Sequence, residues 1–522
     1  MSEKFIESIN IGYSFTGESI ILGAAMYDGE CNPNAQIKVP LKTFNRHGLI
    51  AGATGSGKTK TLQKIAEALS EKGVPTLMMD IKGDLSGIAA AGIANDKINQ
   101  RHLKIGLPWK PLAYPTELLS ISNEPGAKLR ATVIEFGPVL FSKILELNDT
   151  QSGIVSLVFK YADDNGLPLL DLKDFKKTLQ FLTNEGKVEI EKEYGRISTA
   201  STSTIIRKII EIEQQGAERF FGEKSFEVED LLRIDERGMG FMNIMRLADI
   251  QTNPKLFSTF MLSLLAEIYA NFPEEGDLEQ PKLVLFIDEA HLIFNEASKA
   301  LLNQIESIIK LIRSKGVGIF FVTQTPVDIP AAILGQLGMK VQHAFRAFTA
   351  NDRKDLKLIS QNYPESEYYD IEKLLTELGI GEALVTVLNE KGSPTPIAHT
   401  ILCAPQSRMD VLSKEEINNL LAQSALVKKY NQEIDRESAF EILNAKLNSA
   451  NQTVESNAAK PIVNKETTNS ASPVPNIITD ALGSTAGKQV MRTIAREVTR
   501  GLLGVLGLSS GSKRGKKTSS WF

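Results

Sequence analysis

The stretch that decides the fold is Gly52-Ala53-Thr54-Gly55-Ser56-Gly57-Lys58-Thr59. It fits the phosphate-binding pattern G-x-x-x-x-G-K-[S/T], in which backbone N–H groups surround the phosphates, the lysine reaches the β and γ oxygens, and the hydroxyl binds Mg²⁺. Residues 46–51 predict a short buried strand before this loop, and Leu62, Ile65 and Leu69 recur at helical spacing after it. Strand, loop and helix is the order that a P-loop requires. We therefore expect Gly52–Thr59 to bind the cofactor ATP.

A second segment carries carboxylates at the end of an apolar run. Residues 283–287 predict a buried strand, and Asp288 and Glu289 follow it directly. In a P-loop NTPase this strand delivers an aspartate to the Mg²⁺ shell, so Asp288 and the hydroxyl of Thr59 are the expected metal-binding groups. Glu289 stands where a base can orient the attacking water, which favours hydrolysis over phosphoryl transfer and makes Glu289 and Lys58 catalytic candidates. The competing interpretation is that both carboxylates only cap the following helix.

Two further catalytic candidates rest on weaker patterns. Gln324 ends the predicted strand 317–324 and is placed to touch the γ-phosphate, unless it is simply a polar residue leaving a strand. Charge that develops on the γ-phosphate needs an additional cation, which oligomeric ATPases often take from a neighbouring subunit. Arg313 is the first candidate for that cation, with Arg46 and Arg346 behind it. A cation that complements a helix C-terminus is the alternative explanation for Arg313.

Polar residues also follow the predicted strand 76–80. Asp80, Lys82 and Asp84 are expected either to line the active edge of the sheet or to form an exposed turn, and the sequence favours neither. His291, beside the carboxylates, is interpreted as a structural residue rather than a phosphate sensor.

Composition sets limits on location and partners. The 522 residues carry a net charge of −4, so any contact with DNA must come from local basic patches or a pore. Cys31 and Cys403 are far apart and form no C-x-x-C pair, which favours a reducing compartment. The N-terminus lacks the apolar stretch of a signal peptide, and no run approaches the length needed to cross a bilayer. We expect a cytoplasmic protein.

Alternating strands and helices predict an α/β fold, a parallel sheet covered by helices on both faces. Late strands are expected near residues 383–388 and 397–402. The expected divisions of the chain are a short N-terminal β element (1–45), the first part of the core (46–118), a helical insertion (119–236), the second part of the core (237–405), a C-terminal helix opened by a capping box at Ser413 (406–447), a disordered linker (448–480), and a basic amphipathic helix with a charged tail (481–522).

The predicted C-terminal amphipathic helix has an apolar stripe, from Val490 to Val505, opposite Arg492, Arg496 and Arg500. This pattern suits an anionic membrane surface or a docking groove on a protein. Ordinary packing is the alternative.

Taken together, the motifs resemble those of the HerA/FtsK superfamily of ring-forming ATPases. The resemblance rests on the P-loop, the Asp-Glu-Ala-His segment at 288–291, residues 313–318 and Thr323-Gln324, and it covers about residues 20–405. The family's nucleotide site is matched by five residues, Lys58, Thr59, Asp288, Glu289 and Gln324. Residues 80–85 and 328–330 further resemble a bacterial HerA-like subgroup, the YjgR type. HerA itself carries a longer N-terminal β-barrel than the roughly 45 residues that precede this P-loop.

The resemblance implies a RecA-like core, Mg²⁺ with ATP as cofactors, a hexamer, and movement along double-stranded DNA. The first functional hypothesis is therefore a ring ATPase that acts as a DNA translocase or helicase. The alternative is an ATP-gated assembly or scaffold protein whose basic tail contacts a membrane lipid or a protein partner. A small-molecule kinase is disfavoured by Glu289 and by the large insertion.

Overall fold

The structure is a computed structural model that describes residues 3–249, 254–276, 278–295, 299–432, 434 and 437–458. Two compact units emerge from the contacts within the chain. The sheet unit comprises residues up to Ala131 together with Ile210–Ile434, and the helical unit comprises Thr132–Ile209 together with the last described helix.

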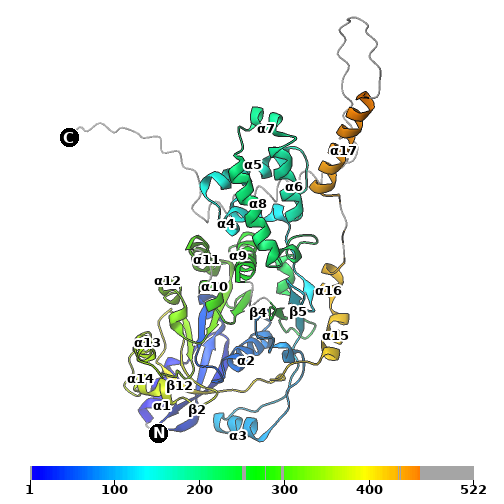
Figure 1. The fold of residues 1–522 in the computed structure, drawn as a ribbon. Helices are drawn as coiled ribbons and strands as arrows, with labels where there is room; N and C mark the ends of the chain where they lie inside the picture. The colour runs from blue at the N-terminus through cyan, green and yellow to red at the C-terminus, as the bar shows by residue number, and fades with distance from the viewer. Residues whose placement is uncertain are drawn as a thin grey trace, which may run out of the picture. The chain divides into compact units, whose positions relative to one another are not determined.

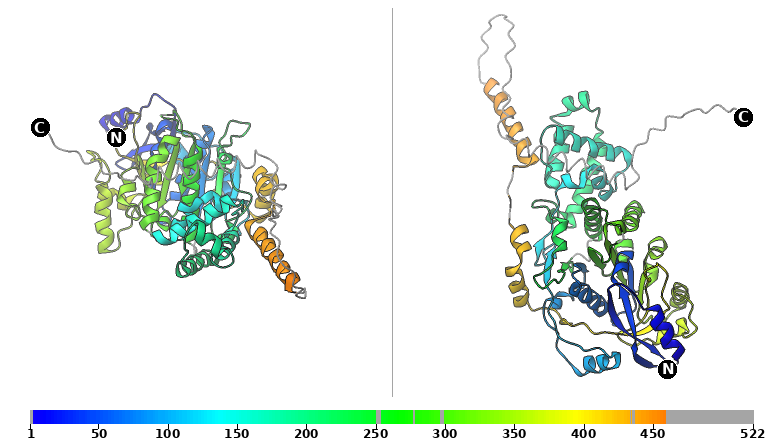
Figure 2. Two further views of the ribbon diagram at one scale, coloured as in Figure 1. Left: turned by 90° about the horizontal axis from the view of Figure 1, so that it is seen from above. Right: turned by 180° about the vertical axis from the view of Figure 1, so that it is seen from behind.

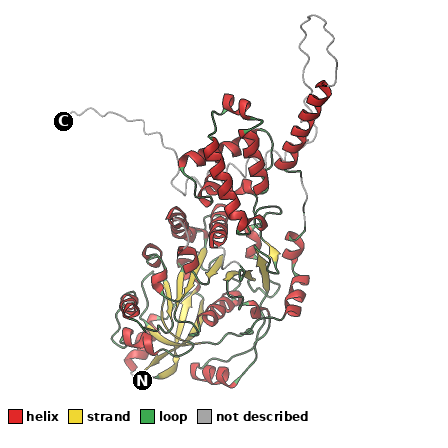
Figure 3. Ribbon diagram, viewed as in Figure 1, coloured by secondary structure: helices red, strands yellow, loops and turns green. Residues whose placement is uncertain are grey.

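The sheet unit is built on one mixed sheet, drawn in yellow in Figure 3. Its strand order is β2-β1-β12-β11-β10-β3-β9-β8-β4-β7-β5-β6. The strands from β10 to β6 pair in parallel, whereas β2, β1, β12, β11 and β10 pair in antiparallel fashion. The strands are β1 (Ser19–Tyr27), β2 (Glu30–Pro40), β3 (Gly48–Ala51), β4 (Thr76–Asp80), β5 (Thr116–Ser120), β6 (Ala127–Lys128), β7 (Met242–Arg246), β8 (Leu283–Ile287), β9 (Val317–Thr323), β10 (Met339–Gln342), β11 (Glu382–Thr386) and β12 (Ala398–Leu402).

Helices cover both faces of the parallel part (Figure 1). Helix α2 (Lys58–Glu71) connects β3 to β4, while α9 (Pro254–Asn271) and α11 (Lys299–Ile312) make the connections β7 to β8 and β8 to β9, which run across the sheet in the opposite direction. Right-handed crossovers therefore put α2 on one face and α9 with α11 on the other. Every residue of β3, β4, β8 and β9 is buried, as expected for strands covered on both sides. The predicted α/β fold is confirmed.

The described part of the sheet unit contains further α-helices. They are α1 (Glu3–Gly12), α3 (Asp96–Ile105), α10 (His291–Asn295), α12 (Ala331–Leu334), α13 (Ala350–Ser360), α14 (Ile371–Glu377), α15 (Lys414–Gln423) and α16 (Ala425–Tyr430). Figure 2 shows two further views of these elements.

His47 ties the P-loop strand to its neighbours. The backbone N–H of Ile319 in β9 donates to His47 Nδ1 at 3.1 Å, and His47 Nε2 lies 2.9 Å from the carbonyl oxygen of Ile309 in α11. Because Nδ1 accepts, Nε2 carries the proton. Gly48, which follows, leaves room for Phe320, since a Cβ there would lie 2.2 Å from that ring. One histidine and one glycine therefore fix β3 against β9.

The helical unit contains α4 (Val133–Ile144), α5 (Asp149–Asp164), α6 (Leu172–Thr183), α7 (Lys187–Glu193), most of α8 (Thr199–Gln214) and α17 (Ala439–Ala458). Side chains cap its helices, with Asn148 accepting from the N–H of Gln151 and Asp171 from those of Lys173 and Asp174. Helix α17 packs on α6, and the N–H of Phe440 donates to Asp174 Oδ1 at 2.9 Å.

The boundaries differ from the expected ones in several places. Residues 1–45 form no separate element, because β1 pairs with β12 inside the main sheet and a helix, α1, precedes it. The helical insertion starts at Thr132 and not at 119, since β5 and β6 still belong to the sheet, and it ends at Ile209 and not at 236. The single helix expected over 406–447 is wrong: Ser413 caps α15 as predicted, but that helix ends at Gln423 and Ser424 caps a new one.

Helix α17 extends to Ala458, into the segment expected to be a linker. The rest of the predicted linker and the predicted amphipathic helix lie outside the described residues. Within the residues that the structure describes, no helix is long and apolar enough to span a bilayer.

The buried His47 predicts a pH-dependent stability. Burial, and then the charge of Arg313, lower its pKa from 6.5 to about 4, so the folded chain keeps this imidazole neutral while the unfolded chain protonates it at a higher pH. The unfolded state therefore binds more protons between these values, and stability falls as the pH drops from about 6.5 towards about 4.

We expect His47→Gln to flatten part of this slope in urea melts at pH 7 and pH 5. His343 retains a dependence of the same sign, because its pKa is also lowered to about 4. His291→Gln, at a part-exposed imidazole, is the control. An unchanged slope in His47→Gln would show that His47 does not contribute.

Candidate active site

The carboxyl ends of four parallel strands bring the predicted residues to one edge of the sheet. Strand β3 leads into the P-loop, β8 into Asp288, β4 ends at Asp80, and β9 leads into Gln324. Their registers align these ends, since Ala51 pairs with Thr323, Phe321 with Ile287, and Ile287 with Met79. Ligand sites of open α/β sheets lie at this edge.

The P-loop has the backbone that its glycines allow. Gly52, Gly55 and Gly57 have φ angles of 149°, 77° and 114°, values that other residues rarely adopt. Gly57 is the N-cap of α2, so the first turn of that helix presents its free N–H groups and the positive end of its dipole at the loop. Such a helix end is an anion-binding site.

Lys58 is buried and folds back over the loop. Its Nζ donates to the carbonyl oxygen of Gly52 at 2.6 Å and to that of Ala53 at 3.2 Å. Burial, followed by the neighbouring charge of Lys82, lowers the pKa of Lys58. The carbonyl oxygens of the loop thus hold the ammonium at the place where the loop would bind an anion.

His343 packs against the backbone of the P-loop and contacts the helix that follows it. Its Nε2 lies 2.9 Å from Thr61 Oγ1 in α2, and its backbone N–H donates to the carbonyl oxygen of Ala51 at 2.7 Å. A Cβ on Gly52 would lie 2.5 Å from His343 Cβ, so the backbone passes directly over this side chain. Burial, and then the charge of Lys58, keep the pKa of His343 near 4 and the ring neutral.

A second support comes from Arg101 in α3. Its guanidinium donates to the carbonyl oxygens of Ile380 and Gly381 at 2.8 and 2.9 Å, and the N–H of Gly381 donates to the carbonyl oxygen of Ser56 at 3.0 Å. Because a guanidinium presents several donors in a fixed plane, one side chain holds this whole turn against the P-loop.

The two carboxylates after β8 are buried. Asp288 is 3% exposed and Glu289 8%, and burial raises the pKa of Asp288. Glu289 has a φ of 46°, an uncommon value for this residue type that places strain at the strand end. Among the described residues, no hydrogen-bond donor reaches Glu289 Oε2. His291 Nδ1 lies 3.3 Å from this oxygen, but without the alignment of a hydrogen bond.

Asp80 and Lys82 have different roles in the structure, whereas the sequence alone could not distinguish them. Asp80 organises the turn after β4, accepting from the N–H groups of Gly83, Asp84 and Leu85. Burial, and then the charge of Asp84, raise its pKa to about 6. Lys82 reaches the carboxylates instead, with Nζ 2.5 Å from Glu289 Oε1. Burial opposes its charge, but Asp288 and Glu289 together raise the pKa of Lys82.

The other candidates take different positions. Gln324 is exposed immediately after β9, at the P-loop edge. Arg313 follows the last residue of α11 and precedes β9, so it lies at the amino ends of the strands, the opposite edge from its own P-loop. Arg46 precedes β3 at that same edge, and Arg346 donates to the carbonyl oxygen of Thr376 at 3.1 Å. The catalytic roles of Gln324 and Arg313 stay predictions.

The residues present fit Mg²⁺. This ion prefers oxygen ligands and is usually bound by one or two protein groups together with substrate phosphates. Thr59, in the first turn of α2, and the buried Asp288 are such groups at one sheet edge. The described residues contain no cluster of three metal-binding side chains, so a closed all-protein metal site is not found there.

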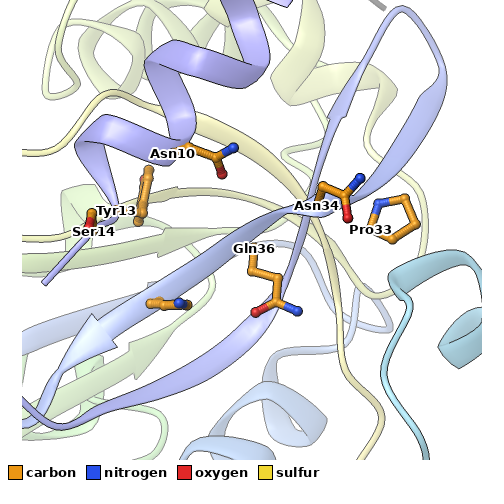
Figure 4. A pocket seen from close by; sticks show the side chains of 7 residues that line it. Asn10, Tyr13, Ser14, Pro33, Asn34 and Gln36 are labelled. Atoms are coloured by element: carbon orange, nitrogen blue, oxygen red, sulfur yellow. The ribbon is translucent and has the colours of Figure 1, made fainter.

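A separate hollow of about 280 Å³ lies beside α1 and β2 (Figure 4). Its lining is mostly amides and hydroxyls, from Asn10, Tyr13, Ser14, Pro33, Asn34, Gln36 and Lys38. The Tyr13 hydroxyl is already used, since it donates to the carbonyl oxygen of Pro396 at 2.7 Å. This hollow contains no catalytic grouping.

A strand, a glycine-rich loop, a helix and a carboxylate pair at the end of another parallel strand, one strand further along the sheet, define a P-loop NTPase. The chain belongs to the family described as Helicase HerA-like C-terminal, whose family model matches residues 26–514. It is thus a P-loop ATPase of the HerA/FtsK type, as the motifs predicted.

Two curated relatives are similar to this chain. Both are described as DNA double-strand break repair helicase HerA, and the one from Sulfolobus acidocaldarius is 23% identical over 360 residues, while the one from Saccharolobus solfataricus is 25% identical over 358. Each match covers 67% of this chain and 64% of the relative, so the chain spans less than two thirds of their length.

Solved structures show the same fold. The plasmid coupling protein TrwB in complex with the ATP analogue ADPNP superposes with a TM-score of 0.52 at 14% identity, over 79% of this chain and 96% of that one. A form of the conjugative coupling protein TrwB in complex with sulphate gives 0.51 at 15% identity, over 78% and 94%. The RecA-like core is thereby confirmed.

The support under the P-loop predicts a selective loss of nucleotide affinity. His343→Ala removes the bond to Thr61 and leaves space beneath Gly52, so we expect nucleotide binding to weaken by about three- to tenfold, the equivalent of one buried hydrogen bond. Calorimetric titration with ADP measures this. Thr61→Val should act in the same direction, and the double variant should lose less than the sum. Wild-type affinity in His343→Ala would argue against this support.

Proposed function

We propose that this protein hydrolyses Mg-ATP to drive movement along double-stranded DNA, working in the cytoplasm as a homo-oligomeric ring, most simply a hexamer. The observation that carries the hydrolytic part is the Asp288–Glu289 pair after β8, a strand that only β9 separates from the P-loop strand β3. DNA as the track is supported by the curated relatives, which are described as DNA helicases. The ring rests on the resemblance of the motifs.

The residues divide the work as follows. The backbone of the loop Gly52–Thr59 and the ammonium of Lys58 bind the phosphates. Thr59 and Asp288 hold Mg²⁺, which neutralises phosphate charge when bound. Glu289 orients the attacking water and takes its proton as the oxygen of that water bonds to the γ-phosphorus. The bond from the γ-phosphorus to the β–γ bridging oxygen breaks at the same time, and ADP leaves with that electron pair.

Two residues complete the proposal. Gln324, exposed beside the P-loop strand, contacts the γ-phosphate and responds to its loss. Arg313 cannot reach its own P-loop from the opposite edge of the sheet, so it serves a neighbouring subunit. Its place after α11 is equally that of a cation complementing a helix C-terminus.

The second candidate is an ATP-gated assembly or scaffold protein, in which hydrolysis switches a binding state and the basic tail contacts anionic lipid or a protein. The net charge of −4 favours it, because a DNA-binding ring would gain from a positive surface.

The assigned roles predict two different failures. Lys58→Ala should weaken nucleotide binding and abolish turnover, whereas Glu289→Gln should still bind ATP and lose about a hundredfold or more in turnover, since it keeps the shape but not the base. Equilibrium binding and phosphate release measure the two effects. Glu279→Gln, at an 80% exposed side chain, is the control. Near-normal turnover in Glu289→Gln would remove Glu289 from the mechanism.

DNA dependence separates the two candidate functions. A motor's ATPase rate should rise severalfold with duplex DNA, and that stimulation should decline as salt replaces phosphate contacts. Rates with and without duplex, between low and physiological salt, provide the test. A rate indifferent to DNA at low salt would favour the scaffold.

A further inference from the structure

The ammonium of Lys82 forms ion pairs with both carboxylates of the site, Asp288 and Glu289. Lys82 Nζ lies 2.5 Å from Glu289 Oε1 and 3.6 Å from Asp288 Oδ2. The Lys82 side chain is 37% exposed, whereas those of Asp288 and Glu289 are 4% and 11% exposed. A solvent-accessible cation therefore contacts the two groups that the proposed function assigns to the metal ion and to water activation.

The fold holds Lys82 in this place. Strand β4 lies beside β8, with Met79 opposite Ile287, so the turns that follow these strands are neighbours. Asp80 fixes its turn through three backbone N–H groups. Within this turn Ile81 is 3% exposed, which anchors the residue directly before Lys82. The turn thus fixes the backbone from which the Lys82 side chain reaches the carboxylates.

Charge determines what happens at this contact when a nucleotide enters. Lys82 cannot stay on Asp288 once a divalent cation binds there, because like charges at such short range repel strongly. Lys82 lies near enough to Lys58 for their charges to interact, so a phosphate bound by Lys58 would also attract Lys82. The phosphate-binding lysine and Lys82 therefore flank the same space.

We propose that Lys82 is a positioning residue that exchanges between two anions. Without the metal ion it pairs with Glu289 and Asp288, which keeps the base from engaging water. With Mg-ATP bound it moves to the terminal phosphate, and Glu289 is released. This inference rests on the proposed ATP hydrolysis, and it adds a reason why Glu289 acts only after the nucleotide and its metal ion are in place.

The alternative is a purely structural role, in which Lys82 only neutralises two buried carboxylates and so stabilises the fold. Removal of the Lys82 charge would then lower the affinity of the site for every ligand to a similar degree. Exchange instead predicts that loss of the Lys82 charge strengthens binding of the metal ion and weakens binding of the terminal phosphate. Loss of the ammonium removes a competitor of the metal ion, but it also removes a ligand of the terminal phosphate.

The experiment compares wild type with Lys82→Gln, Lys82→Arg and Lys72→Gln. Lys72 is a matched control, because it is 38% exposed and pairs with Glu18 at 2.9 Å on the surface. Binding of Mn²⁺ to the ADP complex is measured by electron paramagnetic resonance of the free ion. Affinities for ADP and for β,γ-imido-ATP with Mg²⁺ are measured by calorimetry, and thermal melts check the folding of each variant.

We expect Lys82→Gln to bind Mn²⁺ in the ADP complex about threefold or more tightly than wild type, and to lose about threefold or more in its preference for imido-ATP over ADP. Lys82→Arg, which keeps the charge, and Lys72→Gln should resemble wild type.

Unchanged or weaker Mn²⁺ binding in Lys82→Gln would overturn the exchange, and so would equal losses for ADP and imido-ATP. Failure of wild type itself to bind either nucleotide would instead refute the proposed function, and Lys82 exchange with it.

Discussion

The parallel alignment of β3, β9, β8 and β4 is the constraint on which the rest of the structure depends. These strands are buried on both faces, so the polar residues that follow them lie at the edges of the sheet formed by the strand ends, called rims below. Their registers place the P-loop, the Asp288–Glu289 pair and the turn at Asp80 on one rim. A slip of one residue between neighbours would turn buried side chains to the opposite face and separate the loop from its carboxylates. His47 and the space at Gly48 are two local devices that secure β3 in this alignment.

Charge at the rim is arranged before any ligand enters. The first turn of α2 and the buried Lys58 form a positive cradle, and the buried Asp288 and Glu289 form a negative partner. Buried groups of one sign are costly unless an opposite charge offsets them, and Lys82 supplies that charge to the carboxylates. In the proposed function, Mg-ATP brings phosphate anions to Lys58 and a cation to the carboxylates, so one ligand neutralises both groups.

The parts of the candidate site that could be predicted from the sequence are those formed by short contiguous segments of the chain. The P-loop, the strand that ends in Asp288 and Glu289, and the Ser413 cap are each encoded within a few residues, so their patterns could be recognised directly. His343 and Arg101 were missed, because they reach the loop only through sheet pairing and a helix distant in sequence. Helix α1 was missed too, and the break at Ser424 was hidden inside a run of good helix formers. For Asp80 and Lys82 the residues were noticed, but only the turn geometry separates a structural carboxylate from a cation at the site.

The most direct test of the account is a structure of the protein with Mg²⁺ and a non-hydrolysable ATP analogue. It should show Gly52–Thr59 wrapped around the phosphates, Lys58 moved from the carbonyl oxygens of Gly52 and Ala53 to the phosphate oxygens, and the metal ion between Thr59 and Asp288, with Glu289 facing the γ-phosphate through a water molecule. A nucleotide bound away from this rim, or a γ-phosphate out of reach of Glu289, would contradict it.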